Sequence, residues 1–220
     1  MECNSIIKVC GMRDSENIRA VEALDVQWIG FIFWSNSLRY VAERPAYLPV
    51  KARRVGVFVD APVEKIIQKV EEYALDLLQL HGHETPQYIT TLRSALATLP
   101  SQAEGEKSVL IIKAFNIASA ADFKAVANYE GVADYFLFDT KGRSVGGNGE
   151  KFDWTILDTY DGTTPFLLSG GIGPDDAGRI RSVNHPLLAG IDLNSRFELS
   201  PGLKDITSLC RFLSSLDPHS

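Results

Sequence analysis

The sequence predicts an α/β protein folded as a single (β/α)8 TIM barrel that spans residues 1–220. Eight short apolar runs recur along the 220 residues, and the segments between them carry helix signals. No linker, low-complexity tract or shift in composition divides the chain. Alternating strands and helices are typical of parallel sheets, and eight such units in a chain of this length match a small barrel. We therefore predict one domain.

The eight predicted strands are runs of β-branched, aromatic and other apolar residues bounded by glycine or polar residues. In chain order they are Ile6–Cys10, Trp28–Phe33, Val55–Val59, Leu77–Leu80, Val109–Phe115, Tyr135–Phe138, Pro165–Leu168 and Leu187–Leu193.

Helix signals follow most of these strands. Asp14 begins a capping segment for a helix over Asn17–Leu24, which places its apolar residues on one face. The second unit is the weakest, because Ala42–Leu48 is short and Pro45 and Pro49 interrupt it. The other predicted helices begin at Pro62 or cover Gln87–Leu96, Ala120–Tyr129, Ala177–Val183 and Ile206–Leu216.

An open doubly wound sheet is the alternative fold. Such a sheet usually has fewer strands and a glycine-rich nucleotide-binding turn after the first one. Here Cys10-Gly11-Met12-Arg13 follows the first strand, so that fingerprint is absent.

Composition limits the partners and the compartment. The formal net charge of −6 disfavours a nucleic acid or an anionic membrane as the main partner. Three cysteines, Cys3, Cys10 and Cys210, form an odd, widely spaced set, which favours a reducing, cytoplasmic location. We find no signal peptide and no apolar run of the roughly 18 to 20 residues that a membrane span needs. No cluster has metal-ligand spacing, so no metal is expected.

Two chemically reactive residues end apolar strands. Cys10 ends the first run, and Asp139 directly follows the sixth. Ligands collect at the carboxyl ends of parallel strands, so a thiol and a carboxylate there can act as base and acid on one substrate. A capped helix follows Cys10, and a helix N-terminus can lower the pKa of a thiol, although the sequence does not give the pKa of this one. Packing alone is the other interpretation of this cysteine.

Two late turns predict a phosphate site. Gly170 and Gly171 follow the seventh strand, and Asn194 and Ser195 follow the eighth. Glycines let backbone N–H groups approach an anion, and the corresponding loops of this barrel commonly bind phosphate. Either turn alone is equally consistent with a structural role.

Three further side chains are candidates for substrate contacts. Arg39, in the loop after the second strand, suits bidentate capture of a carboxylate. Gln79 and His81 alternate along the fourth strand and are expected to point together into the barrel mouth. Surface exposure of Arg39 and structural hydrogen bonding by His81 are the competing interpretations. The glycine-rich stretch 141–149 is predicted to be a closing lid or a mobile loop.

The ordered set of motifs resembles the phosphoribosylanthranilate isomerase family over nearly the whole chain. The motifs are Ile6–Met12, Gly30–Phe33 with Ser37–Val41, Val55–Val59, Leu78–Gly82, Phe138–Thr140 with Gly146–Gly149, Leu168–Ile172, and Gly190–Asp192 with Pro201–Asp205.

The resemblance implies a cofactor-free Amadori rearrangement of N-(5′-phosphoribosyl)anthranilate in tryptophan biosynthesis. It implies that Asp139 is the general acid and Cys10 the general base. It further implies that Arg39 holds the anthranilate carboxylate, that Asp192 contacts the substrate, and that the two late turns hold the phosphate. The implied partner is a small phosphorylated substrate, and the chain is expected to be a monomer or homodimer.

Some positions depart from the family pattern. Leu38 stands where the family usually has proline, and Arg196-Phe197-Glu198 replaces the common Gly-Val-Glu. Rival interpretations are another sugar-phosphate isomerase or synthase on this barrel, or a non-catalytic phosphate-ligand binding protein. A related histidine-pathway isomerase would be expected to have an aspartate in place of Cys10, and an indole-forming synthase a Lys and Glu constellation that we do not find.

Overall fold

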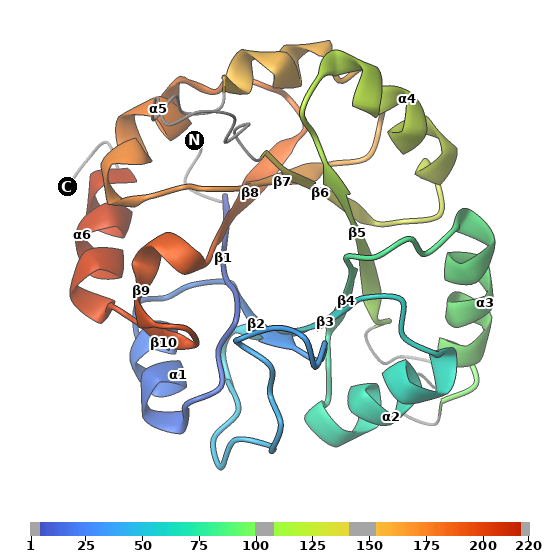
Figure 1. Cartoon of the computed structure of the whole chain (residues 1–220), viewed down its shortest axis with the longest axis horizontal. Coiled ribbons are helices and arrows are strands. Elements are labelled where there is room, and N and C mark those ends of the chain that lie inside the picture. The colour runs from blue at the N-terminus through green and yellow to red at the C-terminus, as the bar shows by residue number, and fades with distance from the viewer. Residues whose placement is uncertain (1–4, 100–107, 141–152, 217–220) are drawn as a thin grey trace.

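The computed structural model contains a closed barrel of eight parallel strands in the order β1 to β8, with helices around the outside (Figure 1). The structure describes residues 5–99, 108–140 and 153–216. The strands are β1 (Ile6–Val9), β2 (Trp28–Ile32), β3 (Arg53–Phe58), β4 (Leu77–Leu80), β5 (Leu110–Asn116), β6 (Tyr135–Asp139), β7 (Phe166–Ser169) and β8 (Leu188–Leu193). The predicted fold class and all eight predicted strands are confirmed, with small shifts at their ends.

Pairing of the first and last strands closes the barrel. Residues Ile6 to Val9 of β1 align with Gly190 to Leu193 of β8 in parallel register. The carboxyl ends of all eight strands therefore meet at one rim, where a parallel barrel positions its functional groups.

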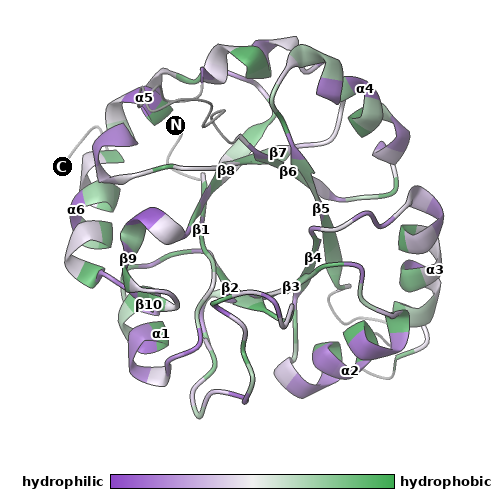
Figure 2. Ribbon diagram, in the orientation of Figure 1, coloured by the Kyte–Doolittle hydropathy of each residue, from purple (hydrophilic) through white to green (hydrophobic). Residues whose placement is uncertain are grey.

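The helices outside the barrel are short and amphipathic. Figure 2 shows both hydrophobic and hydrophilic residues on these helices, which pack against the strands. Asp14 caps the first helix by accepting a hydrogen bond from the Asn17 backbone N–H at 2.8 Å. The α-helices are α1 (Ser15–Glu22), α2 (Val63–Tyr73), α3 (Pro86–Leu96), α4 (Phe123–Val126), α5 (Ala177–Ser182) and α6 (Ile206–Leu216).

Three of the predicted strand–helix units differ from a regular barrel. Residues 33–52 contain no helix, so the predicted second helix over Ala42–Leu48 is wrong. Pro45 and Pro49 lack backbone donors there, which disfavours a helix. The predicted helix Ala120–Tyr129 is a 3-10 turn, the four-residue α4 and a second 3-10 turn. The described part of the link between β6 and β7 contains a 3-10 helix at Trp154–Thr159.

After β8 the chain makes a 3-10 turn at Ser195–Phe197 and then a small hairpin of β9 (Glu198–Ser200) and β10 (Leu203–Lys204). This hairpin lies beside α1 and α6, next to the amino-terminal strand (Figure 1). Arg13 connects it to the loop after β2 by donating to the carbonyls of Leu38 and Pro201 at 3.1 and 2.8 Å.

An apolar cluster fills the barrel interior below the rim. Its side chains come from six of the eight strands and are all buried; they are Trp28, Val55, Leu77, Ile112, Ala114, Leu137 and Leu167. Side chains alternate along a strand, so the residues two positions nearer the carboxyl end also point into the barrel. Several of these residues are polar. None of the described helices is long and apolar enough to cross a bilayer.

Candidate active site

A polar layer covers the apolar barrel interior at the carboxyl ends of the strands. Side chains two residues apart on a strand point to the same side, so the inward position of Lys8 implies the same for Cys10. Lys8 is completely buried, and its Nζ lies 2.8 Å from Asp192 Oδ1 across the β1–β8 pair. The other members of this layer are Gln79 on β4, His81 just after β4, Asp139 on β6 and Ser169 on β7.

Cys10 lies just beyond β1, where its backbone N–H donates to the Leu193 carbonyl at 2.9 Å. Its thiol is buried against β2, since a Cβ added to Gly30 would stand only 2.8 Å from the Cys10 Sγ. Gly30 therefore provides the space that the sulfur occupies.

Burial dominates the pKa of the Cys10 thiol. Burial raises this pKa; the charge of Asp192 raises it further, whereas Lys8 and Lys204 lower it. The N-terminus of a helix can lower a thiol pKa, but the pKa of Cys10 is raised overall. The helix α1 begins only at Ser15 and is capped by Asp14.

Asp139 ends β6 and is buried, with 7% of its surface exposed. Its Oδ2 lies 3.7 Å from His81 Nε2. The other imidazole nitrogen, Nδ1, lies 2.9 Å from Gln79 Nε2. Because an amide nitrogen can only donate, Nδ1 accepts and the ring hydrogen is on Nε2, facing Asp139. The structure thus brings together three residues that the sequence singled out.

Gln79 has a second feature of note. Its Oε1 is buried and has no hydrogen-bond partner among the described residues. A buried acceptor without a partner is costly, and such atoms are typical of places where a ligand completes the hydrogen bonding.

Arg39 is part of a charge network in which it is half-buried and its partners Glu198 and Lys204 have buried side chains. Its Nε lies 2.8 Å from Glu198 Oε1, and its Nη2 lies 2.6 Å from Glu198 Oε2. Lys204 Nζ lies 2.7 Å from the same Glu198 Oε1 and 2.8 Å from Asn194 Oδ1. Two cations share one carboxylate, so the network retains a net positive charge beside Cys10.

Glu198 holds this network in its charged form. Although burial raises the pKa of Glu198, the hydrogen bonds from Arg39 and Lys204 bring it below its ordinary value. The bidentate pair also fixes the plane of the Arg39 guanidinium. Arg39 is therefore presented in one orientation rather than as a freely moving surface side chain.

The predicted phosphate residues lie at neighbouring strand ends. Gly170 and Gly171 follow β7 with positive φ values of 98° and 66°. A Cβ on Gly170 would stand 2.3 Å from the Thr140 carbonyl oxygen, so this turn requires glycine. Asn194 and Ser195 follow β8, which pairs with β7. The Asn194 side chain accepts a hydrogen bond from Lys204, while Ser195 is exposed at the start of a 3-10 turn.

One backbone N–H group after Gly171 already has a hydrogen-bond partner within its own turn. The Gly173 N–H donates to Asp176 Oδ2 at 2.8 Å at the start of the α5 segment. Arg196 lies along this turn, since its Cβ is 3.7 Å from the position that a Cβ on Gly173 would take. The predicted lid, 141–149, lies outside the described residues.

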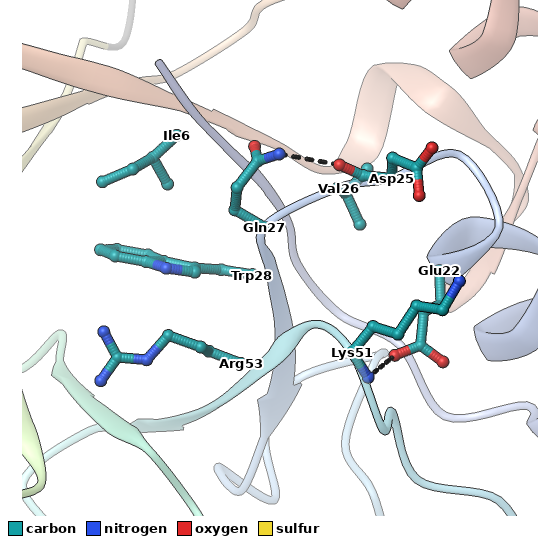
Figure 3. A pocket seen from close by; sticks show the side chains of 8 residues that line it. All are labelled: Ile6, Glu22, Asp25, Val26, Gln27, Trp28, Lys51 and Arg53. Atoms are coloured by element: carbon teal, nitrogen blue, oxygen red, sulfur yellow. Dashed lines mark hydrogen bonds between the residues drawn. The ribbon is translucent and has the colours of Figure 1, made fainter. Parts of the chain in front are cut away.

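A separate cavity of about 390 Å³ opens at the amino-terminal ends of β1 to β3 (Figure 3). Trp28 and Arg53 point side by side into it, next to Ile6. It lies at the opposite end of the barrel from the polar layer. The reactive thiol and carboxylate are therefore not part of it.

Three residues of the site were missed in the sequence: Lys8, Glu198 and Lys204. Lys8 had a detectable signal, because it is a charged residue inside an apolar strand with the same alternation as Cys10. The two others could be assigned only after the β9–β10 hairpin was seen to return toward the loop after β2. The described residues contain no group of three or more acidic, His or Cys side chains arranged for a metal.

Comparison with known proteins identifies the family of this chain. Residues 7–215 match the family described as N-(5′-phosphoribosyl)anthranilate (PRA) isomerase. The protein of that name from Parabacteroides distasonis is 48% identical over 217 residues, covering 96% of this chain and 93% of its own length. The one from Phocaeicola vulgatus is 46% identical over 211 residues, covering 96% and 97%.

Solved structures of the same name share the fold. The Thermotoga maritima phosphoribosyl anthranilate isomerase aligns with a TM-score of 0.75 and 28% identity, covering 96% of this chain and 98% of that one. A phosphoribosyl anthranilate isomerase in complex with reduced 1-(o-carboxyphenylamino)-1-deoxyribulose 5-phosphate aligns with a TM-score of 0.76, 27% identity and the same coverage. The chain belongs to the N-(5′-phosphoribosyl)anthranilate isomerase family.

Proposed function

We propose that this chain converts N-(5′-phosphoribosyl)anthranilate to 1-(2-carboxyphenylamino)-1-deoxyribulose 5-phosphate, without a cofactor, in tryptophan biosynthesis. The observation that carries the assignment of residues is the polar layer over the apolar barrel, in which Cys10 directly follows β1 and Asp139 ends β6. Family membership and the ligand of the related complex support the same reaction.

Asp139 is the proposed general acid. It donates its proton to the ribose ring oxygen, the ring opens at C1′, and the anthranilate nitrogen lone pair forms an iminium. Burial favours the neutral, proton-donating form of a carboxyl group. The Nε2–H of His81, 3.7 Å from Asp139 Oδ2, helps to orient this carboxyl group.

Cys10 is the proposed general base. Its thiolate takes the proton from C2′, and the C2′–H electrons neutralise the iminium to give an enolamine. The enol hydroxyl then loses its proton as C1′ gains one, which yields the ketone. Because burial raises the thiol pKa, the positive charge of the iminium favours the thiolate at the step where it is needed.

The remaining groups are proposed to bind the substrate. Arg39 holds the anthranilate carboxylate, with Glu198 occupying the guanidinium edge formed by Nε and Nη2. Gln79 Oε1 is buried without a partner in the described structure, and it accepts a hydrogen bond from a ribose hydroxyl. Asp192, beside the thiol, contacts the ribose. The backbones of Gly170, Gly171, Asn194 and Ser195 bind the phosphate.

The test is loss of substrate fluorescence after enzyme is added to freshly made phosphoribosylanthranilate. We expect Cys10→Ser and Asp139→Asn each to lower kcat by about 10²- to 10⁴-fold. Cys210→Ser is the matched control, since Cys210 is an exposed free thiol on α6. No turnover by the unmodified chain would reject the isomerase. Full kcat in Cys10→Ser would remove the thiol from its role.

A non-catalytic phosphate-ligand binder is the alternative from another class. It predicts binding of a phosphorylated product analogue without turnover. The paired thiol and carboxyl group favour catalysis, because binding alone does not require them.

The assembly and location are also proposals. One related structure is of the Thermotoga maritima enzyme, described as dimeric. We propose that this chain is a monomer or homodimer, that it has no nucleic-acid or membrane partner, and that it is cytoplasmic. Light scattering after size-exclusion chromatography distinguishes the two assemblies, and cell fractionation tests the location.

A further inference from the structure

The buried ammonium of Lys8 has no role in the reaction steps described above. It is completely buried in the barrel, beneath the rim and on the same side of β1 as Cys10. A buried lysine is costly unless it is paired, so its presence next to a reactive thiol requires an explanation.

One ion pair and one charge interaction define its position. Lys8 Nζ donates to Asp192 Oδ1 at 2.8 Å, and its charge acts on the Cys10 sulfur, two residues along the chain and on the same side of it. The ammonium is therefore paired with a carboxylate on β8 and lies on the side of β1 that the thiol faces. Asp192 Oδ2 lies on the other side, 3.4 Å from Ser169 Oγ.

We propose that Lys8 is a positioning residue that stabilises the thiolate form of Cys10 against the cost of burial, while Asp192 keeps the Lys8 ammonium charged and in place. This inference rests on the proposed role of Cys10 as the base. Lys8 itself transfers no proton. The thiol releases its proton to solvent, and the thiolate then takes the C2′ proton.

The charges around the thiol support this assignment. Besides Lys8 and Asp192, the charged groups that act on Cys10 are Lys204 on β10 and Arg39 in the loop after β2. Asp139 and His81 lie farther around the rim, at the end of β6 and just after β4. Of the charged neighbours, Lys8 has the largest effect on the thiol pKa, and that effect is to lower it.

The state of Lys8 is consistent with this role. Burial lowers the pKa of Lys8, but Asp192 and the Cys10 sulfur outweigh burial and raise it overall. The shift therefore favours the charged ammonium over the neutral amine.

The test is a titration of the thiolate by its ultraviolet absorbance near 240 nm, without substrate. The same titration of the Cys10→Ser protein provides the background from the other cysteines and tyrosines. Replacing Lys8 alone would leave Asp192 buried and unpaired, so the informative variant is Lys8→Met/Asp192→Asn, which removes both charges. We expect its thiol pKa to rise by about one to three pH units relative to the unmodified protein.

Lys113→Met is the matched control. Lys113 is the other buried lysine of a central strand; it faces Glu84 and the Gly82 carbonyl rather than the barrel mouth. We expect its thiol titration to be unchanged, even if it lowers the melting temperature. The acidic limb of kcat/KM should shift with the thiol pKa in the double variant only.

An unchanged or lowered thiol pKa in a folded double variant would overturn the proposal. Lys8 would then contribute only to the packing of the barrel. The titration needs no turnover, so its outcome is independent of the proposed reaction. If the unmodified chain fails to convert phosphoribosylanthranilate, the reaction is wrong, whether or not Lys8 sets the thiolate.

Discussion

Arg39 and Glu198 lie 159 residues apart in the chain and form a bidentate ion pair, with N–O distances of 2.8 and 2.6 Å. The side chain of Glu198 is almost completely buried, and it also binds Lys204. Arg39, the residue proposed to bind the substrate carboxylate, is therefore held in place by Glu198 of the β9–β10 hairpin. Its orientation depends on that hairpin.

The first prediction concerns Glu198→Gln. Removing the shared charge leaves the buried Lys204 ammonium and the half-buried Arg39 guanidinium without their common counterion, so the free energy of unfolding should fall by about 3 to 5 kcal/mol. In the folded variant Arg39 is less well oriented, and KM should rise more than kcat falls. Urea unfolding and steady-state kinetics measure the two effects.

The variant Arg39→Ala tests the same site directly. An unchanged KM for this variant would contradict carboxylate binding by Arg39.

The second prediction concerns Gly30→Ala. The added Cβ would stand 2.8 Å from Cys10 Sγ, so the sulfur has to move and kcat should fall by about tenfold or more. Gly178→Ala is the control, because nothing lies within 4 Å of an added Cβ and helix α5 should tolerate alanine. Equal kcat values for the two variants would show that the position of the thiol does not limit the reaction.

The third prediction concerns Arg196. Its side chain lies along the turn after β7, beside the proposed phosphate site, and it makes no ion pair within the described residues. We expect Arg196→Ala to raise KM and to weaken competitive inhibition by inorganic phosphate by about three- to tenfold, with kcat preserved. Inhibition constants at two salt concentrations provide the measurement. Identical inhibition constants for Arg196→Ala and the unmodified protein would show that the Arg196 guanidinium points to solvent.

The fourth prediction concerns stability and pH. One carboxylate oxygen of Glu22 accepts hydrogen bonds from three successive backbone N–H groups, those of Val50, Lys51 and Ala52, at 2.7–2.9 Å. Burial raises the pKa of Glu22, but these bonds and the one from the Tyr47 hydroxyl bring it below its ordinary value overall.

A depressed carboxyl pKa contributes stability that is fully present above the unfolded value of about 4.5 and is lost as the pH falls through the folded value. We expect Glu22→Gln to lower the free energy of unfolding at pH 7 by about 1.5 to 3 kcal/mol, with little change in KM. The difference from the unmodified protein should shrink below pH 4. A constant difference from pH 7 to pH 3 would show that the charge of Glu22 contributes nothing.

The fold was predictable because strand formation is encoded locally. Each apolar run, such as Leu77–Leu80, is bounded by polar or glycine residues, and the strand in the structure has the same limits. The segment after β2 was harder, because spacing alone suggested a helix there. The energetic cost of Pro45 and Pro49 decided against it.

The site was predictable where function coincides with a strand end. Cys10 and Asp139 could be placed at the rim from alternation and topology alone. Lys8, Glu198 and Lys204 could not, because their partners are distant in sequence and their burial depends on the closed barrel. The direction of the Cys10 pKa shift was likewise set by burial rather than by the nearest helix.

Closure of the barrel by β1 and β8 has a consequence for synthesis of the protein. Lys8 and its partner Asp192 are 184 residues apart. At about 5 to 20 residues per second, the ribosome makes Asp192 roughly 10 to 40 s after Lys8. Until then the first strand has an unpaired edge and an unneutralised lysine, so the nascent chain cannot complete its reactive centre. The reactive centre can form only after β8, the last strand of the barrel, has left the ribosome.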